Sequence, residues 1–539
     1  VGSEMCIRDS CCTVLLDGKP SLSCQLDPQQ AAGRAVVTLE GLPDHQRQLL
    51  AEAFIGRGAV QCGFCTPGIA VRAAHLVNKG LTGKRQRVER ALAGHLCRCT
   101  GYNRIVDAIQ TAGEAWQEME AGQESPVDTP DGPAGGVGSS SARYQGHDQV
   151  LGMKDFVADL EVEGMLHATV VVSEHPRAKV LAIDPANALA MDGVHRVFTA
   201  EDIPGTCNHG LIVRDWPLMV AAGETTRYVG DVLAIVVADT QHRARVAARS
   251  VQVAYDVHDP ICSPDEALAS EAPAIHPSGN LLEVCSFRRG DVDSALEESA
   301  HTVEETFTTQ RIEHAFLEPE ACLAIPREGA LKIFSQGQGV HDDRRQIAAI
   351  LALDEERIEV ELVSNGGAFG GKEDLSIQGH TALAAWLLQR PVKTVLTREQ
   401  SIRIHPKRHP LELRYTVGCD DEGRLTAVRA RIVGDTGAYA SVGTKVLERA
   451  AGHACGPYKV PHVDVEARTV YTNNPPCGAM RGFGANQASF AIEGALDRLA
   501  EQVGLDGYDI RERNVLDPGD RFATGQRMNS SCGIRQTLE

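Results

Sequence analysis

The stretch that decides the fold is residues 61–68, which read QCGFCTPG and are followed at residues 97–102 by CRCTGY. Four cysteines in two close pairs are the ligand set that an iron–sulfur cluster requires. We therefore predict that one cluster is held by Cys62, Cys65, Cys97 and Cys99. Structural zinc and unrelated buried cysteines are the alternatives. The CxC spacing of the second pair, at the end of an expected helix, suits a zinc knuckle poorly.

The residues around these cysteines have a helical pattern. Apolar residues recur at three-to-four spacing over residues 46–58, 67–79, 84–96 and 102–120, which predicts four short helices. Thr66 is the expected N-cap and Pro67 the first helical residue, where its missing N–H costs nothing. The second helix is therefore expected to start just after Cys65.

The rest of the chain has the composition of further domains. Residues 123–143 are rich in Pro, Gly and Ser, which predicts an interdomain linker. After it, expected strands at 168–172, 194–199, 232–237 and 250–255 accompany a helix at 240–248. A second turn-rich stretch, residues 260–280, precedes a larger mixed region. We expect an α+β multidomain protein.

Composition limits the partners. The 539 residues include 53 basic and 72 acidic side chains, for a net charge of −19, which repels a phosphate backbone. We expect no nucleic acid partner. No stretch approaches the roughly 18 apolar residues of a membrane helix, so no membrane contact is expected. Sixteen cysteines are too dilute for a disulfide scaffold and favour a reducing, cytoplasmic location.

With these motifs, residues 61–102 resemble the second, helical [2Fe–2S] domain of the xanthine dehydrogenase and aldehyde oxidase family of molybdenum hydroxylases. The resemblance implies that Gln61 touches the pterin of the molybdenum cofactor. Residues 12–18 and Cys24 resemble the end of the family's plant-type [2Fe–2S] domain. The two earlier ligands of that domain would fall at Glu4 and Asp9, while Cys6 and Cys11 are misplaced. We expect that this first cluster cannot form and that upstream sequence is missing.

The resemblance also implies a domain order. The runs at residues 173–178, 193–194, 202–205 and 227–231 are similar to the family's α/β hammerhead domain. We expect a foreign segment at 1–10, a plant-type remnant at 11–26, the four-helix [2Fe–2S] domain at 27–122 and a linker at 123–145. The hammerhead domain is expected at 146–262 and a C-terminally truncated first molybdopterin-binding domain of mixed α/β structure at 285–539.

A glycine-rich loop, residues 366–373 (GGAFGGKE), nearly matches the phosphate-binding pattern GxxxxGK[ST]. Glu373 stands where that pattern needs a Mg²⁺-binding hydroxyl, and its charge would repel a nucleotide. Glycines allow backbone N–H groups to approach an oxo or phosphate group closely. The resemblance implies that this loop lies against the molybdenum site, with Gly367, Ala368 and Phe369 binding the cofactor.

Further site residues come from the same resemblance. Gln338 matches the glutamine near the molybdenum oxo group, with Gln336 as the alternative, and Arg481 in the sequence AMRGFG matches a cofactor contact. Phe483 would stack on the substrate. Arg449 matches the substrate arginine of purine hydroxylases.

The substrate prediction depends on three of these side chains together. Glu373 and Arg449 could hydrogen-bond opposite edges of a purine that is stacked on Phe483. Arg449 could also stabilise negative charge that develops on the heterocycle. Both residues are therefore predicted to be catalytic as well as substrate-binding. The alternative is that Glu373 and Arg449 are an exposed surface pair.

The activity implied by the resemblance is oxidation of hypoxanthine or xanthine, with the aldehyde or other N-heterocycle hydroxylases and a non-catalytic electron-transfer fragment as alternatives. The order of domains, without a flavin domain, and the amino-acid sequence of residues 403–490 resemble those of the fused, selenium-dependent xanthine dehydrogenases. The implied cofactors are [2Fe–2S], molybdopterin or its cytosine dinucleotide form, and FAD on a partner subunit, in a homo-oligomer. The family's catalytic glutamate, in a VGEPP-like motif, does not occur, so the chain is expected to be an inactive fragment.

Overall fold

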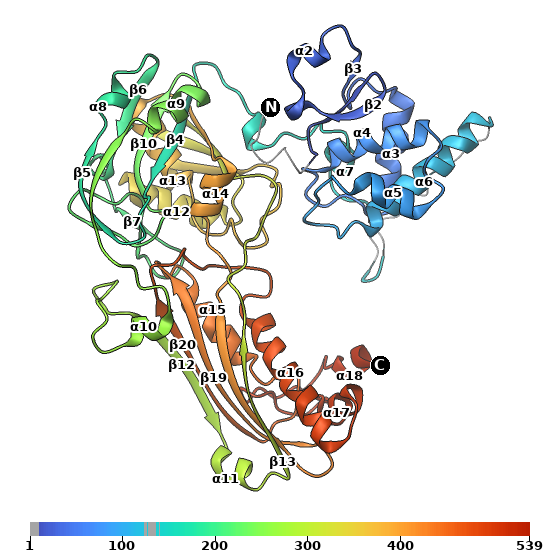
Figure 1. The fold of residues 1–539 in the computed structure, drawn as a ribbon, viewed down its shortest axis with the longest axis vertical. Coiled ribbons are helices and arrows are strands. Elements are labelled where there is room, and N and C mark those ends of the chain that lie inside the picture. The colour runs from blue at the N-terminus through green and yellow to red at the C-terminus, as the bar shows by residue number, and fades with distance from the viewer. Residues whose placement is uncertain (1–9, 123–126, 128–135, 140) are drawn as a thin grey trace.

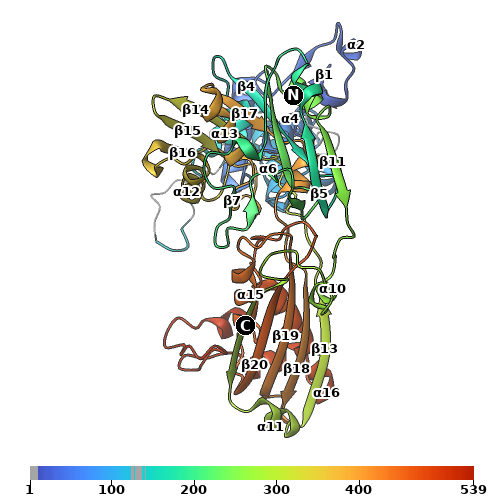
Figure 2. The same cartoon turned by 90° about the vertical axis from the view of Figure 1, so that its left-hand side faces the viewer.

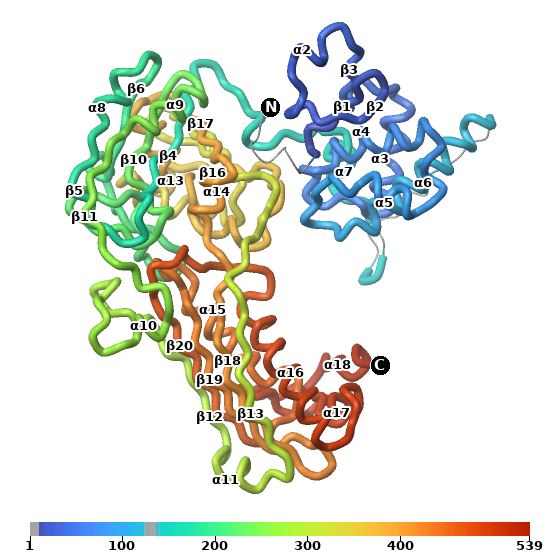
Figure 3. The backbone as a smooth tube through the Cα atoms, viewed as in Figure 1, coloured from blue at the N-terminus to red at the C-terminus, as the bar shows by residue number. Residues whose placement is uncertain are grey.

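The computed structural model describes residues 10–122, 127, 136–139 and 141–539, which form three parts (Figure 1). We name them the N-terminal domain (residues 10–122), the upper lobe, built on a seven-stranded sheet, and the lower lobe, built on a five-stranded sheet. The predictions that concern residues 1–9, and most of those on the linker at 123–135, lie outside the described residues. The tube in Figure 3 shows the chain passing from the upper to the lower lobe and back.

The N-terminal domain contains the four predicted helices. They are α3 (Asp44–Gly56), α4 (Thr66–Asn78), α5 (Arg85–Leu92) and α6 (Asn103–Glu120). Thr66 is the first residue of α4 and Cys65 occupies the N-cap position, so the predicted N-cap was one residue late. A small sheet of order β2-β1-β3 and two short helices precede them: β1 (Thr13–Leu16), β2 (Lys19–Leu22), η1 (Ser23–Gln25), α2 (Pro28–Ala31) and β3 (Val36–Val37).

The upper lobe joins segments that are far apart in the sequence. Its sheet has the order β16-β15-β14-β17-β4-β10-β6, and β17 pairs with β4 in parallel, with Val392 opposite Leu166. The strands are β4 (Leu166–Val172), β6 (Val194–Phe198), β10 (Val232–Ala238), β14 (Ala321–Arg327), β15 (Ala330–Ser335), β16 (Ile358–Leu362) and β17 (Val392–Val395). The region predicted as the hammerhead therefore shares one sheet with four later strands, β14 to β17, which lie between residues 321 and 395.

Helices and small sheets complete the upper lobe. β10 is buried at all seven positions, as expected for a central strand. The remaining elements are η2 (Val157–Asp159), β5 (Ala178–Asp184), α8 (Ala186–Leu189), η3 (Ala200–Asp202), β7 (Asn208–His209), β8 (Trp216–Pro217), β9 (Thr225–Thr226), α9 (Gln241–Ala248), β11 (Gln252–Val257), α12 (Val340–Leu351), η4 (Glu355–Arg357), α13 (Gln378–Leu388) and α14 (Arg398–Ile404). The short helix α7 (Gly146–Val150) packs instead against α3 and α4 of the N-terminal domain (Figure 1). The predicted strands and helix of this region are confirmed to within a few residues.

The lower lobe is a long sheet with its two longest helices on one face (Figure 2). Its strand order is β12-β20-β19-β18-β13, with β12 (Leu281–Arg289), β13 (His301–Thr308), β18 (Leu411–Cys419), β19 (Leu425–Gly437) and β20 (His462–Tyr471). α15 (Gly443–Gly452) and α16 (Ala485–Val503) pack on it in one apolar core. The smaller helices are α10 (Pro264–Leu268), α11 (Val292–Glu297), α17 (Gly507–Asn514) and α18 (Ile534–Leu538). The predicted α+β multidomain fold is confirmed.

None of the helices in the described part of the chain is both long enough and apolar enough to span a bilayer.

Candidate functional site

The four predicted cluster ligands come together at the ends of two helices. Cys62 and Cys65 lie in the turn before α4, and Cys97 and Cys99 lie in the loop before α6. The sulfurs of Cys62 and Cys99 are 3.5 Å apart, and the thiols of Cys65 and Cys97 are hydrogen-bonded. Tyr102 fixes this loop, because its hydroxyl accepts from the Cys97 N–H at 2.8 Å and donates to the His95 carbonyl at 2.9 Å.

The hydrogen bonds between the thiols shift the pKa values of the two partners in opposite directions. The hydrogen bond with Cys65 lowers the pKa of Cys97 to about 5, and the hydrogen bond with Cys62 lowers the pKa of Cys99. The pKa values of Cys62 and Cys65 are raised by the same contacts and by burial. Because iron and zinc bind the thiolate, the site is set up to lose its remaining protons when metal enters.

The distances between the sulfurs distinguish an iron–sulfur cluster from a single zinc ion. Four thiolates at about 2.3 Å from one tetrahedral zinc would all lie about 3.8 Å from each other. In the described residues, the one group of three or more candidate ligand atoms that all lie within 4.8 Å of one another is Glu313, His314 and His405, without any cysteine. The four thiols thus form two separate pairs, which fits a two-iron cluster better than one zinc ion.

The earlier cysteine pair is also assembled. Cys12 and Cys24, assigned by resemblance to the plant-type domain, have their sulfurs 3.2 Å apart. The positions expected for the other two ligands, Glu4 and Asp9, lie outside the described residues.

The glycine-rich loop is pressed against a second turn. A Cβ at Gly370 would lie 2.5 Å from the carbonyl oxygen of Ala479, and φ at Gly370 is +102°. The Arg481 N–H donates to the Phe369 carbonyl at 3.0 Å. Phe369 has φ of 57°, a strained conformation for a bulky residue that often marks functional loops. The loop and the turn at 479–484 therefore form one rigid wall.

Lys372 shows that the loop is not a nucleotide-binding loop. Its ammonium lies 3.2 Å from the Glu318 carboxylate, and both side chains are 2% exposed. Glu318 also accepts from the Gly366 N–H at 2.7 Å. Burial raises the pKa of Glu318 and lowers that of Lys372, against the attraction between the two charges. The lysine therefore faces the core and clamps the loop, instead of reaching for a phosphate.

The two candidate glutamines have different environments. Gln338 is exposed beside the loop, and its Oε1 accepts from the N–H groups of Gly370 and Lys372 at 3.0 and 3.3 Å. Gln336 is 2% exposed, donates to the Pro319 carbonyl at 3.0 Å and accepts from Lys372. Gln338 is accordingly the one that a ligand could reach.

Arg449 and Phe483 meet at the edge of the same wall. The Arg449 guanidinium lies 5.5 Å from the centre of the Phe483 ring, within cation–π range. Phe483 has φ of 51° and closes a tight turn by donating its N–H to the Met480 carbonyl at 2.7 Å. Gly484 of this turn lies against the backbone of α15, the helix that carries Arg449.

Glu373 lies on the segment that runs beside this turn. Asp374 packs against Gly478, and the carboxyl of Glu373 is half-buried. Burial, and then the charge of Asp342, raise the pKa of Glu373. No ion pair within 4.0 Å joins Glu373 to Arg449 in the part of the chain that the structure describes.

The other predicted cofactor residues also fit a ligand face. Gln61 and Arg481 are exposed, while Gly367 and Ala368 are buried in the wall and present backbone. The buried thiol pairs suit a [2Fe–2S] cluster, and the glycine loop with its exposed polar neighbours suits a large anionic cofactor. The residues present therefore fit both groups.

Sequence reasoning missed two features near the wall. One is Arg98, whose Nε donates to the His314 carbonyl at 2.9 Å. The other is a buried ionic cluster in which the His405 ring lies 2.6 Å from Glu313 and 3.2 Å from Glu320, with Lys407 2.8 Å from Glu313. The buried, charged run at residues 405–409 (HPKRH) was a signal for the second. Nothing in the local sequence signalled the first.

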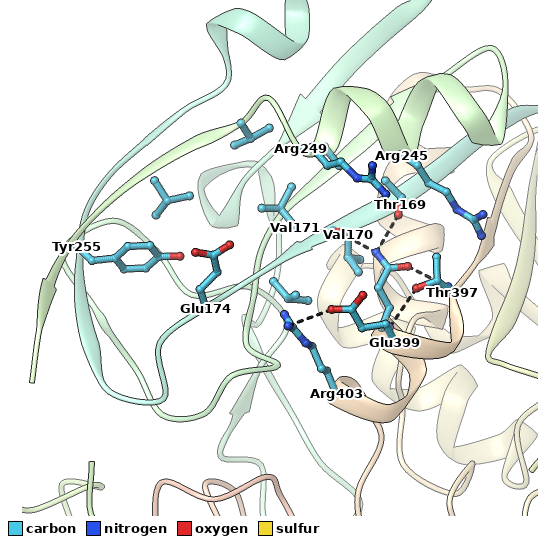
Figure 4. Close-up of a pocket in the computed structure, with 15 residues that line it drawn as sticks. Thr169, Val170, Val171, Glu174, Arg245, Arg249, Tyr255, Thr397, Glu399 and Arg403 are labelled. Atoms are coloured by element: carbon cyan, nitrogen blue, oxygen red, sulfur yellow. Dashed lines mark hydrogen bonds and ion pairs between the residues drawn. The ribbon is translucent and has the colours of Figure 1, made fainter. Parts of the chain in front are cut away.

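A separate cavity of about 330 Å³ lies between β4, β11, α9 and α14 (Figure 4). Its wall includes the side chains of Thr169, Glu174, Arg249 and Tyr255, and Arg403 in its wall pairs with Glu399 at 3.0 Å. None of the predicted site residues lines it, so it is distinct from the candidate site.

Comparisons with known proteins agree with this architecture. Residues 38–110 match the [2Fe-2S] binding domain, residues 151–259 the aldehyde oxidase and xanthine dehydrogenase a/b hammerhead domain, and residues 275–515 the molybdopterin cofactor-binding domain.

Individual relatives cover most of the chain. The nicotinate dehydrogenase large molybdopterin subunit of Eubacterium barkeri is 39% identical over 404 residues, 75% of this chain and 95% of that protein. A probable xanthine dehydrogenase subunit of Bacillus subtilis is 37% identical over 400 residues, 74% of this chain but 53% of that protein. The solved aldehyde oxidoreductase from Desulfovibrio gigas superposes with a TM-score of 0.93 at 30% identity, covering 100% of this chain and 61% of that structure.

The fold and site define an oxidoreductase with [2Fe–2S]-binding and molybdopterin-binding domains. The chain belongs to the xanthine dehydrogenase and aldehyde oxidase family of molybdenum hydroxylases. It spans little more than half the length of the Bacillus relative and of the Desulfovibrio structure.

Proposed function

We propose that this chain is the iron–sulfur and substrate-binding part of a hydroxylase that oxidises purines such as hypoxanthine and xanthine. The main observation in support of this proposal is that the Arg449 guanidinium lies over the Phe483 ring, beside the wall that bears Glu373. The reaction is R–H + H₂O → R–OH + 2 H⁺ + 2 e⁻. When bound, the molybdenum cofactor would supply oxygen transfer and two-electron chemistry, and the cluster would pass the electrons on singly.

The residues of the chain have separate tasks in this proposal. The four cysteines hold the cluster, and the cofactor is held by Gln61, Gln338, Gly367, Ala368, Phe369 and Arg481. Phe483 stacks on the heterocycle. Arg449 donates hydrogen bonds to one edge and stabilises negative charge on the ring. Glu373, whose pKa is raised, can be protonated and donate a hydrogen bond to a ring nitrogen or oxygen.

A second candidate substrate is a pyridine carboxylate. The observation in its favour is the 39% identical relative named nicotinate dehydrogenase. Arg449 is exposed, and no carboxylate pairs with it in the described residues, so it could bind a substrate carboxylate. Aldehydes are the third candidate, since the Desulfovibrio structure is named for them. The purine proposal requires Glu373 and Arg449 together, whereas a pyridine carboxylate requires Arg449.

The proposed assembly extends beyond this chain. The relatives named as subunits support a partner subunit, and we propose that it carries FAD as the next electron acceptor, in a cytoplasmic homo-oligomer. The cytosine dinucleotide form of molybdopterin is part of the same proposal.

The test is substrate oxidation by the complete enzyme that contains this chain, with hypoxanthine, nicotinate and benzaldehyde compared by kcat/KM. Replacing Arg449 by Met should lower kcat/KM for hypoxanthine by about 30- to 160-fold, from the loss of roughly 2–3 kcal/mol of a charge-assisted hydrogen bond. Replacing Glu373 by Ala should lower it by about 2- to 13-fold, from the loss of roughly 0.5–1.5 kcal/mol of a neutral hydrogen bond. Lys445→Met, one turn away on α15, is the control and should change nothing. Unchanged hypoxanthine oxidation in both site variants would exclude the purine assignment, and a loss confined to nicotinate in Arg449→Met would favour the second candidate.

A further inference from the structure

Arg98 stands between two cluster ligands, yet its side chain contacts another part of the molecule. Its Nε donates to the carbonyl of His314, 216 residues away, at 2.9 Å. Its guanidinium lies 5.6 Å from the centre of the Phe369 ring. One side chain thus joins the loop that carries Cys97 and Cys99 to the glycine loop of the upper lobe.

The Phe369 ring is held by a second cation. The Arg481 guanidinium lies 5.1 Å from its centre, and the Arg481 N–H donates to the Phe369 carbonyl at 3.0 Å. The ring is thereby fixed by one arginine of the N-terminal domain and one of the turn at 479–484. The strength of a cation–π contact depends on where the cation lies over the ring. The contacts of Arg98 and Arg481 with Phe369 therefore help to fix the position of the N-terminal domain relative to the glycine loop.

The segment that accepts the Arg98 hydrogen bond contacts both the N-terminal domain and the glycine loop. Leu317 is buried in the apolar core of the N-terminal domain, and Glu318 accepts from the Gly366 N–H at 2.7 Å. The imidazole of His314 lies 2.8 Å from the carbonyl oxygen of Ala479. Five successive residues, 314–318, therefore contact the N-terminal domain, the glycine loop and the second turn.

Apolar side chains also take part in this contact. Phe64, between the ligands Cys62 and Cys65, meets Phe156 edge to face at 5.0 Å and lies against Gly366. Apolar contacts hold two surfaces together but do little to fix their relative orientation. Domains move relative to each other unless their interface is large. The hydrogen bond and the cation–π contact of Arg98 are directional and fix this relative orientation. Lysine could not supply both, because it lacks the planar guanidinium.

We propose that Arg98 is a positioning residue that docks the cluster-bearing loop on the glycine loop and so keeps the cluster in electron-transfer contact with the molybdenum site. The docking stands on the contacts themselves, and the electron-transfer part rests on the proposed function. In that function each substrate releases two electrons and two protons while water supplies the hydroxyl oxygen. The cluster, held by the four cysteines, would take these electrons one at a time by reducing one iron(III) to iron(II), and would pass each on to the flavin of the proposed partner before it takes the next.

The experiment compares Arg98→Ala, Arg98→Lys and the control Arg90→Ala, an exposed arginine on α5 of the same domain, in the complete enzyme. Visible absorption and EPR after dithionite reduction first establish that the cluster is intact. Hydrogen exchange is then followed at the amides of Gly366 and Arg481, which are bonded to Glu318 and Phe369. Stopped-flow absorption follows reduction of the cluster by hypoxanthine.

Arg98→Ala should raise exchange at these amides about tenfold or more and slow reduction by substrate at least tenfold, with dithionite reduction unchanged. Arg98→Lys should recover only part of both, and Arg90→Ala should match the unsubstituted enzyme. Wild-type exchange in Arg98→Ala and Arg98→Lys would overturn the docking role, and wild-type substrate reduction would overturn the electron-transfer role. If hypoxanthine does not reduce the unsubstituted enzyme, the proposed function fails, while the exchange data still decide the docking.

Discussion

The buried ion pair between Lys372 and Glu318 allows a quantitative test of how the glycine loop is held. Both side chains are 2% exposed, and Glu318 also accepts from the Gly366 N–H. Lys372→Met would leave an unpaired buried carboxylate, and Glu318→Gln would leave an unpaired buried ammonium. Either change should destabilise the loop by about 3–5 kcal/mol, the usual cost of breaking a buried pair by removing one partner.

The double variant should be much less damaged than either single change. Met is apolar and of similar length to Lys, and the side-chain amide introduced by Glu318→Gln can still accept from the Gly366 N–H, so neither position of the pair keeps an unpaired charge. Replacing both partners of a buried pair is often close to neutral. The two changes should therefore be strongly non-additive, with a coupling free energy of at least about 3 kcal/mol.

The assay is native-state hydrogen exchange of the Gly366 amide, because the chain has several domains and a single unfolding free energy is not defined for it. A loss of about 3 kcal/mol corresponds to roughly 160-fold faster exchange. The exposed pair Arg498–Glu501, with side chains 59% and 70% exposed, is the control, and its removal should leave exchange unchanged. A double variant that exchanges as fast as the sum of the two single effects predicts would refute the reasoning.

Three further predictions follow from the site. Cys99→Ser should abolish the visible absorption of the cluster formed with Cys62, whereas Cys285→Ser, far from both cysteine motifs, should retain it; a full spectrum in Cys99→Ser would contradict the ligand assignment. Gly370→Ala should reduce molybdenum content in the complete enzyme, because its Cβ would lie 2.5 Å from a carbonyl oxygen, while Gly452→Ala, with nothing within 4 Å, should not. Burial raises the pKa of Asp374 to about 7, above its value of about 3.9 in an unfolded chain, so its protonated form favours the fold and stability should fall between about pH 4 and pH 7. Asp374→Asn should flatten this part of a pH profile of the opening free energy at the Gly478 amide, measured by native-state hydrogen exchange, and an unchanged slope would refute it.

Local regularities explain what could be predicted. Helices α3 to α6 follow from apolar residues at a period near 3.6, because each residue's neighbours on a helix are three or four positions away. The expected strands β4, β6, β10 and β11 were likewise found in place. The error at Thr66 was of one residue, the scale at which capping preferences cannot resolve a helix start.

The sequence by itself predicted the cluster cysteines, the glycine loop and the family, because these predictions depend on residue types at short, fixed spacings. Only the tertiary structure decided which side chains of those motifs are exposed, where a ligand could reach them, and which are buried in the core. It turned Lys372 toward Glu318, separated exposed Gln338 from buried Gln336, and paired Cys62 with Cys99 across two motifs. It also brought Arg98 to His314. Such contacts join residues far apart in the chain, and their formation depends on the packing of whole domains, which no local pattern encodes.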